Sequence, residues 1–281
     1  MSIRVQSGAE CGQDELLSFI NRPNLAYEHL DWFPSTARLS KDSTLCLCYA
    51  GQIEAAISVA PETQDFAWLR FFFAQRDGNH STNFNQLIEH AKIWLSSQSI
   101  PQLFSLATSE WLENLLLANG FYMQNRLVSL FTHRISGSDP DPDSKIVIRP
   151  MRLNDLKAVW ELDQRCFAPP WQLNQLSLEK CYQLGEYVSL ATLDGTLIAY
   201  QVTTRFMDNL HLARLAVHPQ LRGRNIAKTL LFDLSRHFEG SHFESFSVNT
   251  QEDNLASLRL YSLMGFKQEG NLVPVYCLDL A

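Results

Sequence analysis

The sequence predicts an α/β (mixed α+β) protein with two similar domains, each a mostly antiparallel mixed sheet flanked by helices. Three observations support this prediction. The 281 residues exceed the length of one average domain. With 46% of the residues hydrophobic, either half can bury a core of its own. In each half, paired strand-like runs come first and helices alternate with strands later, which is typical of a mixed sheet with helices on both faces.

The first strands of each half form a hairpin pattern. Two β-rich runs flank a tight-turn dipeptide, Thr44–Tyr49 with Ile53–Val59 in the first half and Tyr187–Leu193 with Thr196–Phe206 in the second. Later in the second half, residues 225–238 carry apolar side chains at a spacing near 3.6, which predicts an amphipathic helix. A further helix is expected over residues 255–264, because Gly265 is a natural C-cap.

Landmarks of the first half return in the second half after 144 or 145 residues. The pairs are Ile3-Arg4 and Ile148-Arg149, Ala50-Gly51 and Asp194-Gly195, Arg70 and Arg214, and Gly120-Phe121 and Gly265-Phe266. Because the period spans a whole domain, it indicates a duplication rather than a solenoid of short repeats.

Residues 136–145 separate the two halves. This stretch contains two prolines and three aspartates and has no apolar periodicity, which is the composition of a linker. We therefore expect domains at residues 1–135 and 146–281.

Charge and composition limit the partners. A net charge of −7 argues against nonspecific binding of nucleic acid, which depends on a basic surface. The chain has no signal-peptide pattern and no apolar run of the roughly 20 residues that a membrane span requires. The six cysteines lack metal-ligand spacing, and we expect reduced, mostly buried thiols and no metal. These features predict a cytoplasmic protein without a membrane partner.

The most informative segment runs from the strand that ends at Val217 into the helix at residues 225–238. A short turn with proline and glycine joins the two elements, and Arg222 and Arg224 lie in it. Such a turn presents successive N–H groups, and the helix start adds unpaired donors and a positive dipole end. This combination suits a pyrophosphate. An ordinary strand–turn–helix with a basic tip would show the same pattern.

Residues 215–227 resemble the acyl-CoA-binding motif of the GNAT superfamily of N-acetyltransferases. The family pattern is Arg/Gln-x-x-Gly-x-Gly/Ala, and here it reads Arg222-Gly-Arg-Asn225-Ile-Ala227. Asn225 stands where the family has glycine. Asparagine is among the few other residues that tolerate a positive φ, so we expect the loop shape to survive with a side chain near the phosphates.

Residues 248–266 resemble a second signature of the family, a strand, an asparagine-containing turn at Asn254, and a helix that ends in Tyr261-x-x-x-Gly265-Phe266. The resemblance covers roughly residues 146–276. It implies an intact, catalytic GNAT domain in the second half, with acetyl-CoA as cosubstrate. The implied cofactor-binding residues are Leu215, Ala216, Val217, Arg222, Gly223, Arg224, Asn225, Ile226, Ala227, Lys228, Asn254 and Tyr261.

The resemblance also implies roles in catalysis. Residues 215–217 would hydrogen-bond the pantetheine arm like an added strand, and an N–H near Val217 would polarise the carbonyl. Tyr261 would donate a proton to the departing thiolate, although a tyrosine that only packs the core would look the same. His211 matches a position where histone-type relatives carry a glutamate, so it is a candidate base. The alternative is a half-exposed strand histidine without a role.

The acceptor is expected between the first two helices and the strand ends. Phe167 and Trp171 lie in a loop that resembles one in protein N-terminal acetyltransferases, and we expect them to line the acceptor pocket, although core packing would also explain them. Asn249 stands where some ribosomal-protein acetyltransferases carry a glutamate, and an amide cannot accept a proton. We include Asn249 among the substrate-binding residues.

The first half lacks these features. The segment around Gly78 does not have the Arg-x-x-Gly spacing, and Leu116 occupies the position that corresponds to Tyr261. The first half therefore resembles a degenerate copy of the GNAT fold, and we expect one coenzyme A site per chain.

The leading prediction is an acetyl-CoA-dependent N-acetyltransferase that acts on a primary amine of a small molecule or a peptide N-terminus. A noncatalytic acyl-CoA-binding or scaffold protein is the alternative, suggested by Asn225 and Asn249. The tandem arrangement also resembles that of mycothiol synthases, which acetylate a sugar amine.

Overall fold

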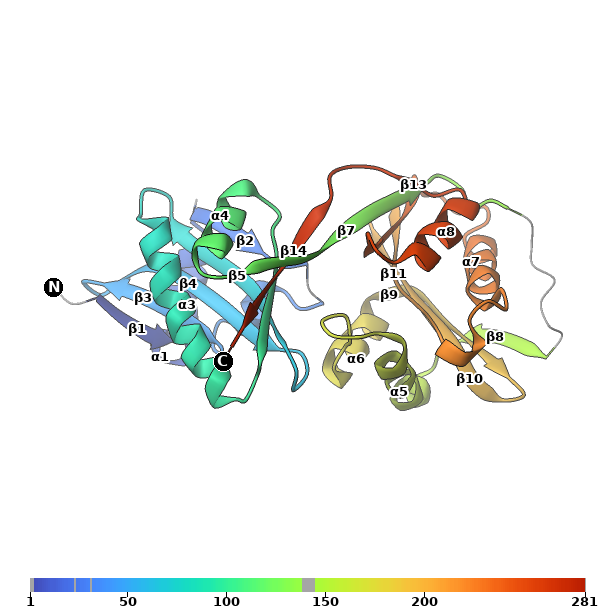
Figure 1. Ribbon diagram of the computed structural model, residues 1–281, viewed down its shortest axis with the longest axis horizontal. Helices are drawn as coiled ribbons and strands as arrows, with labels where there is room; N and C mark the ends of the chain where they lie inside the picture. Colours follow the sequence, from blue (N-terminus) through green and yellow to red (C-terminus); the bar gives the residue numbers. More distant parts are fainter. Residues whose placement is uncertain (1–2, 23, 31, 138–144, 281) are drawn as a thin grey trace. The chain divides into compact units, whose positions relative to one another are not determined.

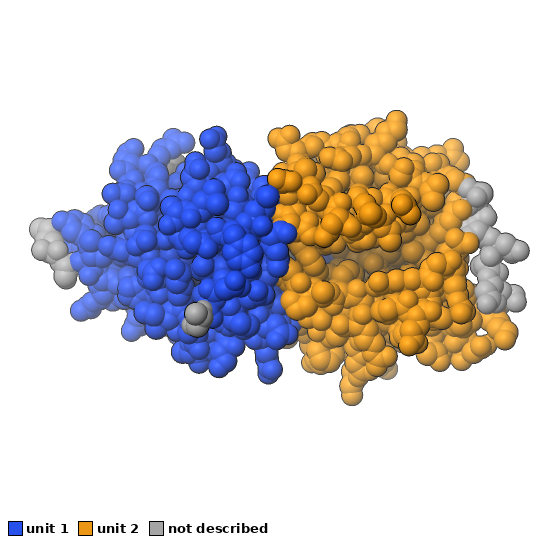
Figure 2. All heavy atoms as spheres, in the orientation of Figure 1, with its two compact units in different colours: residues 1–124, 273–281 blue, residues 125–272 orange. Residues whose placement is uncertain are grey.

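The computed structural model describes residues 3–22, 24–30, 32–137 and 145–280 (Figure 1). The chain forms two compact units, unit 1 with residues 1–124 and 273–281 and unit 2 with residues 125–272, coloured separately in Figure 2. Each unit has a mixed sheet and helices, which confirms the predicted mixed α+β class. Most of the expected linker, residues 138–144, lies outside the described residues. No described helix is long and apolar enough to cross a membrane.

The two units do not follow the expected division of the chain at residues 136–145, because each half gives its last strand to the other unit. Strand β7 (Tyr122–Thr132), from the first half, pairs antiparallel with β12 (Ser245–Gln251) in unit 2. Strand β14 (Val273–Asp279), from the end of the chain, pairs antiparallel with β6 (Gln102–Leu106) in unit 1. Residues from the first half of the chain therefore form part of the sheet of unit 2.

Unit 1 contains a sheet of strand order β1-β3-β4-β5-β6-β14, with β2 on β5. Phe72 of β5 packs toward α3 with its ring 5.0 Å from that of Phe84, whereas Phe71 and Phe73 pack with Phe19 of α2 on the other face. The bounds are β1 (Ile3–Ser7), α1 (Gly8–Cys11), α2 (Gln13–Ile20), β2 (Asn24–Glu28), η1 (Ser35–Arg38), β3 (Thr44–Tyr49), β4 (Gln52–Pro61), β5 (Ala67–Gln75), α3 (His80–Ser97) and α4 (Glu110–Ala118).

Unit 2 contains a sheet of strand order β7-β12-β11-β10-β9-β8, with β13 on β7. Leu210 and Leu212 of β11 pack with Leu231 and Leu234 of α7 in one core cluster. The bounds are β8 (Ile146–Pro150), η2 (Leu153–Asp155), α5 (Leu156–Cys166), α6 (Gln175–Leu184), β9 (Gly185–Leu193), β10 (Thr196–Phe206), β11 (Asn209–Val217), η3 (Pro219–Leu221), α7 (Ile226–His237), α8 (Leu255–Leu263) and β13 (Lys267–Gln268). Both helices expected in the second half are present.

The parallel strands β11 and β12 part in the middle of the sheet of unit 2. Their pairing joins residues 209–212 to residues 245–248, whereas β11 continues to Val217 and β12 to Gln251. We call the unpaired edge of β11 at residues 213–217 the open edge. Because a strand edge carries unpaired N–H and C=O groups, the open edge can accept an extended ligand.

The strand registers confirm a shared framework in the two units and correct one sequence landmark. A bulge interrupts β4–β5 between Ser58 and Val59, and another interrupts β10–β11 between Val202 and Thr203. Ser58 pairs with Phe71, whereas Val202 pairs with Arg214. Phe71 is therefore the structural equivalent of Arg214, and the expectation that Arg70 corresponds to Arg214 was wrong by one residue. The two bulges lie at equivalent places and do not cause this difference. It comes from the connection between the strands, which has five residues between the paired Pro61 and Ala67 but four between the equivalent Arg205 and Leu210.

Candidate active site

The turn between β11 and α7 has the backbone of an anion-binding loop. Asn225 adopts the left-handed conformation, with φ 60° and ψ 9°, and its side chain makes no capping hydrogen bond. Gly223 has φ 82°, and a Cβ there would meet no atom within 4 Å, so the surface above it is open. Thr229 N–H donates to Asn225 O in the first bond of α7, so Ile226 and Ala227 N–H have no intrahelical acceptor. These donors and the helix dipole fit a pyrophosphate.

The two arginines of the turn differ in their surroundings. Arg222 turns back onto the protein, where Nε donates to Val217 O at 3.3 Å and Nη2 donates to Cys166 O at 3.1 Å. Its guanidinium therefore ties the turn to the end of α5. Arg224 is exposed, and its charge faces solvent at the turn. Lys228, in the first turn of α7, places Nζ 5.9 Å from the ring centroid of Phe232.

The open edge presents the backbone groups that the sequence predicted. His218 N–H donates to Ile198 O of β10 at 2.8 Å, so by strand alternation Leu215 and Val217 direct their N–H and C=O groups away from β10, toward the open edge. Ala216, between them, directs its backbone toward β10. Val217 O already accepts from Cys166 Sγ at 3.3 Å, which leaves its N–H for a ligand.

Tyr261 lies where β11 and β12 part. It is only 5% exposed and belongs to the core cluster that contains Leu212 and Val248, with Leu215 packed against it. Burial raises the pKa of the Tyr261 phenol, so the hydroxyl stays protonated at neutral pH. The two predicted roles of Tyr261, packing in the core and donating a proton to the departing thiolate, are compatible, because the buried phenol keeps its proton.

His211 lies on the neighbouring part of β11, where β11 and β12 are still paired. Its Nδ1 is 2.9 Å from Ser247 Oγ, and burial lowers the pKa of the imidazole, so His211 is neutral at pH 7. His211 and Val217 are six residues apart, about 20 Å along a strand. His211 therefore cannot touch a group that is bound at Val217. The predicted role of His211 as the base and the predicted role of Val217 N–H as the donor to the acetyl carbonyl do not fit one reacting centre.

Asn249 is exposed on β12, and its Oδ1 accepts a hydrogen bond from Ser129 Oγ at 2.9 Å. The amide NH₂ of Asn249 is therefore directed away from Ser129 and can donate to a ligand. Ser129 comes from β7, in the first half of the chain. Sequence reasoning missed Ser129 because its neighbourhood depends on the exchange of the last strands.

The predicted acceptor residues Phe167 and Trp171 are held by Arg214. The guanidinium carbon lies 3.8 Å from the ring centroid of Phe167, and Nη1 donates to Trp171 O at 2.9 Å. Arg214 also forms an ion pair with the fully buried Asp163, which accepts a hydrogen bond from Tyr200 OH at 2.5 Å. The loop after α5 is thus fixed by a buried charge network. Sequence reasoning missed this network, and the signal that could have indicated it is Asp163 on the same face of α5 as Val159 and Leu162.

Asn254 caps α8. Its Oδ1 accepts from Ser257 N–H at 3.2 Å, and its Nδ2 donates to Thr250 Oγ1 at 3.1 Å. Both ends of the amide are engaged, so a contact with cofactor has to compete with the cap. Asn254 thereby positions the helix that carries Tyr261.

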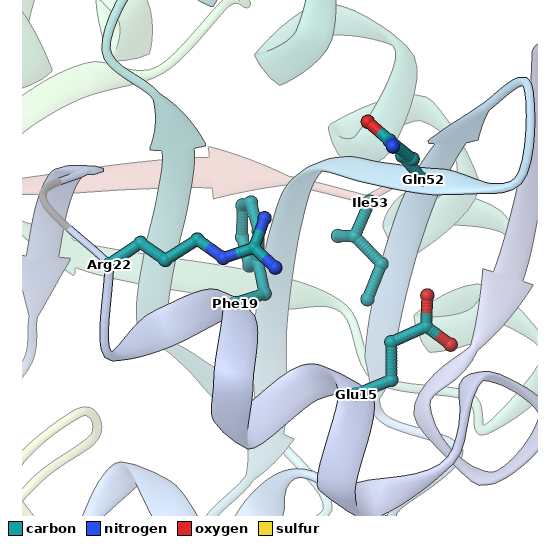
Figure 3. A pocket seen from close by; sticks show the side chains of 5 residues that line it. All are labelled: Glu15, Phe19, Arg22, Gln52 and Ile53. Atoms are coloured by element: carbon teal, nitrogen blue, oxygen red, sulfur yellow. The ribbon is translucent and has the colours of Figure 1, made fainter.

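Two hollows lie elsewhere. In unit 2 a hollow of about 450 Å³ lies beside β8, β9 and the later turns of α7, where Asp233 accepts from Tyr187 OH at 2.6 Å. In unit 1 a hollow of about 80 Å³ lies between α2 and β4 (Figure 3). Neither hollow is lined by a residue of the open edge or of the turn at residues 222–228.

Comparison with known proteins places this arrangement in a family. The profile of the acetyltransferase (GNAT) family matches residues 156–266. L-2,4-diaminobutyric acid acetyltransferase of Bordetella parapertussis is 30% identical over 135 residues, which cover 46% of this chain and 71% of that protein. The chain belongs to the GNAT acetyltransferase family.

Two further similarities extend the comparison of this GNAT acetyltransferase with known proteins. The [ribosomal protein bS18]-alanine N-acetyltransferase of Salmonella typhimurium is 29% identical over 118 residues, which cover 41% of this chain and 76% of that protein. A tandem GNAT protein from the clavulanic acid biosynthesis pathway superposes over 100% of this chain and 99% of its own, with a TM-score of 0.64 and 13% identity. The predicted tandem GNAT fold is thus confirmed. As a family member, the chain is an acetyl-CoA-dependent N-acetyltransferase whose acceptor is an amine.

Proposed function

We propose that unit 2 alone carries the acetyltransferase site and that its acceptor is a primary amine of an amino-acid-like compound, either free or at a peptide N-terminus. The observation that carries the site is the open edge of β11, which leads into a left-handed turn at Asn225 and the first N–H groups of α7. The acceptor class rests on the two relatives, whose names specify an alanine residue of a protein and a diamino acid.

Acetyl-CoA supplies the thioester whose acetyl group is transferred. The turn at residues 222–228 would hold the pyrophosphate, and Leu215 and Val217 would hydrogen-bond the pantetheine arm. Asn225 does not prevent this, because it adopts the backbone conformation for which glycine is usually required. This fit supports cofactor binding, which the enzyme and a noncatalytic acyl-CoA-binding protein both require, so the thiol-release experiment below is what separates them.

We assign the polarisation of the acetyl carbonyl to Leu215 N–H rather than to Val217 N–H. Leu215 packs against the cluster that contains Tyr261, Leu212 and Val248, at the point where the strands part. A donor there acts beside the phenol that protonates the leaving thiolate. An N–H fixed in a sheet is preorganised for a developing negative charge, which is the condition for an effective oxyanion donor.

Tyr261 holds the proton for the thiolate, and His211 is the proposed base. His211 lies four residues from Leu215, about 13 Å along the strand, so it would accept the proton of the amine through a chain of several water molecules. Ser247 Oγ, at 2.9 Å from Nδ1, fixes the ring and leaves Nε2 for this exchange. Asn249 Nδ2 would donate to a carbonyl or carboxylate oxygen of the acceptor.

The experiment that tests the proposal measures release of the coenzyme A thiol from acetyl-CoA with a panel of amines. The panel contains peptides with N-terminal alanine, 2,4-diaminobutyrate, glucosamine and a simple alkylamine. We expect turnover with the first two and little with the alkylamine. Binding of acetyl-CoA without thiol release for any amine would support the scaffold alternative, and turnover limited to glucosamine would support a sugar acceptor. The cytoplasmic location stays a prediction, which microscopy of the tagged chain can check.

A further inference from the structure

Three cysteines of unit 1 gather at one place, outside every site described above. Cys11 ends α1, while Cys46 and Cys48 lie two residues apart on one face of β3. Cys11 Sγ is 4.0 Å from Cys48 Sγ. Cys46 is fully buried, whereas Cys11 and Cys48 are half-buried. The sequence predicted reduced, mostly buried thiols without distinguishing among them, and the structure separates one fully buried thiol from two half-buried ones.

The geometry around Cys11 and Cys48 allows a bond between them. A disulfide requires sulfur atoms about 2.05 Å apart, so the two must approach by about 2 Å. Cys11 is followed by Gly12, which has φ 84° and no atom within 4 Å of an added Cβ. A rotation of both side chains and a small movement of the turn between α1 and α2 at Gly12 can supply this approach.

The surroundings give the two thiols different roles. A hydrogen bond from the Cys46 thiol, assisted by one from Cys48, lowers the pKa of Cys11, although burial and the carboxylates of Glu10 and Glu15 oppose this effect. Burial and the neighbouring Cys11 raise the pKa of Cys48 to about 12. Thiolates are the reactive form, so Cys11 is the first nucleophile and Cys48 the resolving thiol.

We propose that Cys11 and Cys48 form a dithiol that small disulfide oxidants, such as oxidised glutathione, convert reversibly into an intramolecular disulfide. The Cys11 thiolate attacks one sulfur of oxidised glutathione, and one glutathione thiolate leaves. Cys48 Sγ then loses its proton and attacks Cys11 Sγ, and the second glutathione thiolate leaves. The two cysteines lose two electrons and two protons, and two molecules of reduced glutathione form.

The hollow in Figure 3 lies next to this pair. It is lined by Glu15, Phe19, Arg22, Gln52 and Ile53, and Ile53 is the partner of Cys48 in the β3–β4 register. Figure 3 shows the α2 side chains facing the start of β4 across it. At about 80 Å³ it can hold a few water molecules but not a ligand of ordinary size. It gives α2 room to shift when the disulfide forms, which is a structural role and not a binding site.

The bond would cross-link the α1–α2 turn to β3 and close the chain between residues 11 and 48. Closing a loop of this length restricts the unfolded state, so unit 1 gains stability. We expect the melting temperature of unit 1 to rise by about 5–10 °C on oxidation and to return when dithiothreitol is added.

The test incubates the full-length chain with oxidised glutathione, alkylates the remaining thiols and analyses a tryptic digest by mass spectrometry. Trypsin leaves Cys11 in the peptide of residues 5–38 and the other two cysteines in that of residues 42–70. We expect these two peptides to be cross-linked through Cys48, with Cys46 alkylated after denaturation. The cross-link should be absent in Cys11→Ser and Cys48→Ser and present in Cys277→Ala, the control.

Three outcomes would overturn the proposal. They are a stable mixed disulfide of glutathione on Cys11 with Cys48 free, a cross-link through Cys46, and no reaction of folded wild type at Cys11. Circular dichroism on each variant shows whether it is folded. If Cys48→Ser fails to fold, Cys11→Ser and the fragmentation spectrum of the wild-type cross-link still decide the pairing.

Discussion

Unit 1 and unit 2 differ at one equivalent strand edge, which is paired in unit 1 and unpaired in unit 2. In both units two parallel strands pair only at their beginnings, β5 with β6 at residues 67–68 and 103–104, and β11 with β12 at residues 209–212 and 245–248. In unit 2 the rest of the β11 edge is open. In unit 1 the matching edge of β5, at residues 71–75, pairs antiparallel with β2. The chain itself thus occupies in unit 1 the edge that a cofactor would use in unit 2.

Two further differences reinforce this contrast. Only residues 76–78 separate β5 from the cap Asn79 in unit 1, whereas residues 218–224, with a 3₁₀ turn, separate β11 from Asn225 in unit 2. Leu116 matches Tyr261, because Phe121 N–H donates to Leu116 O as Phe266 N–H donates to Tyr261 O. The features that the two units share are the sheet, the bulge and the helix ends, and packing and hydrogen bonds within each unit are enough to maintain them. Unit 1 has therefore kept the fold, while its described residues have neither an open edge on β5 nor a counterpart of the tyrosine.

The largest expected effect comes from Tyr261, the group that unit 1 replaces with leucine. Tyr261→Phe keeps the packed ring and removes the proton, so kcat should fall about 10²–10⁴-fold with little change in acetyl-CoA affinity. Steady-state kinetics and calorimetry measure the two quantities. Tyr122→Phe, which removes a hydroxyl from unit 1, is the control. Unchanged kcat in the folded variant, with chemistry rate-limiting, would assign Tyr261 to packing alone.

The next effect tests whether only one unit binds coenzyme A. Ala227→Glu places a carboxylate in the first turn of α7, where like-charge repulsion should weaken coenzyme A binding about 100-fold. Ser81→Glu is the matched change in the first turn of α3 and should leave the Kd unchanged. An acidic residue favours a helix start, so neither change should unfold its unit.

Calorimetry on the full chain should also give a stoichiometry of one. The separate halves are unsuitable for this measurement, because each would lose the strand that the other provides. A second binding event, or sensitivity to Ser81→Glu, would show that β2 does not block the edge of β5.

Particular residues show how much of this could be predicted from the sequence. The helix at residues 225–238, the positive φ of Asn225 and the burial of Tyr261 follow from local pattern and side-chain chemistry. The exchange of β7 and β14 does not, because an apolar strand fits either of two similar sheets, so Ser129 could not be placed beside Asn249. The β2–β5 pairing was also missed, since residues 24–28 pair with strand residues more than 40 positions away. Arg70 was misaligned because the connection between β4 and β5 is one residue longer than that between β10 and β11, so the offset between the units changes from 144 to 143 residues.

A smaller effect is expected at His211, whose position in the register is matched by Trp68 in unit 1. A base with a lowered pKa has less driving force for proton transfer, so His211→Ala should lower kcat/KM about tenfold at pH 7.5. Only neutral imidazole accepts a proton. The ratio of wild-type to variant rates should therefore shrink toward one as the pH falls from 6.5 through the lowered pKa. A ratio that is constant with pH would leave His211 a structural role beside Ser247.

The smallest effect concerns the two asparagines at the N-cap positions of α3 and α7. Asn79 has φ −80° and its side chain accepts from Thr82 N–H at 3.1 Å, whereas Asn225 is left-handed and its side chain caps nothing. Asn225→Gly should therefore leave the melting temperature within about 2 °C of wild type, because no cap is lost and glycine tolerates this backbone. It should leave the Kd for coenzyme A equal or lower it by up to about fivefold, because the side chain no longer crowds the phosphates.

Asn79→Ala should show the reverse pattern. Loss of the cap costs about 1 kcal/mol, or about 3–5 °C in the melting temperature of unit 1, with no change in coenzyme A binding. Differential scanning calorimetry and titration of the same two samples separate the effects. A large loss of affinity in Asn225→Gly would mean that the amide itself binds the phosphates, so that unit 2 gained a ligand at the position where the family pattern has glycine.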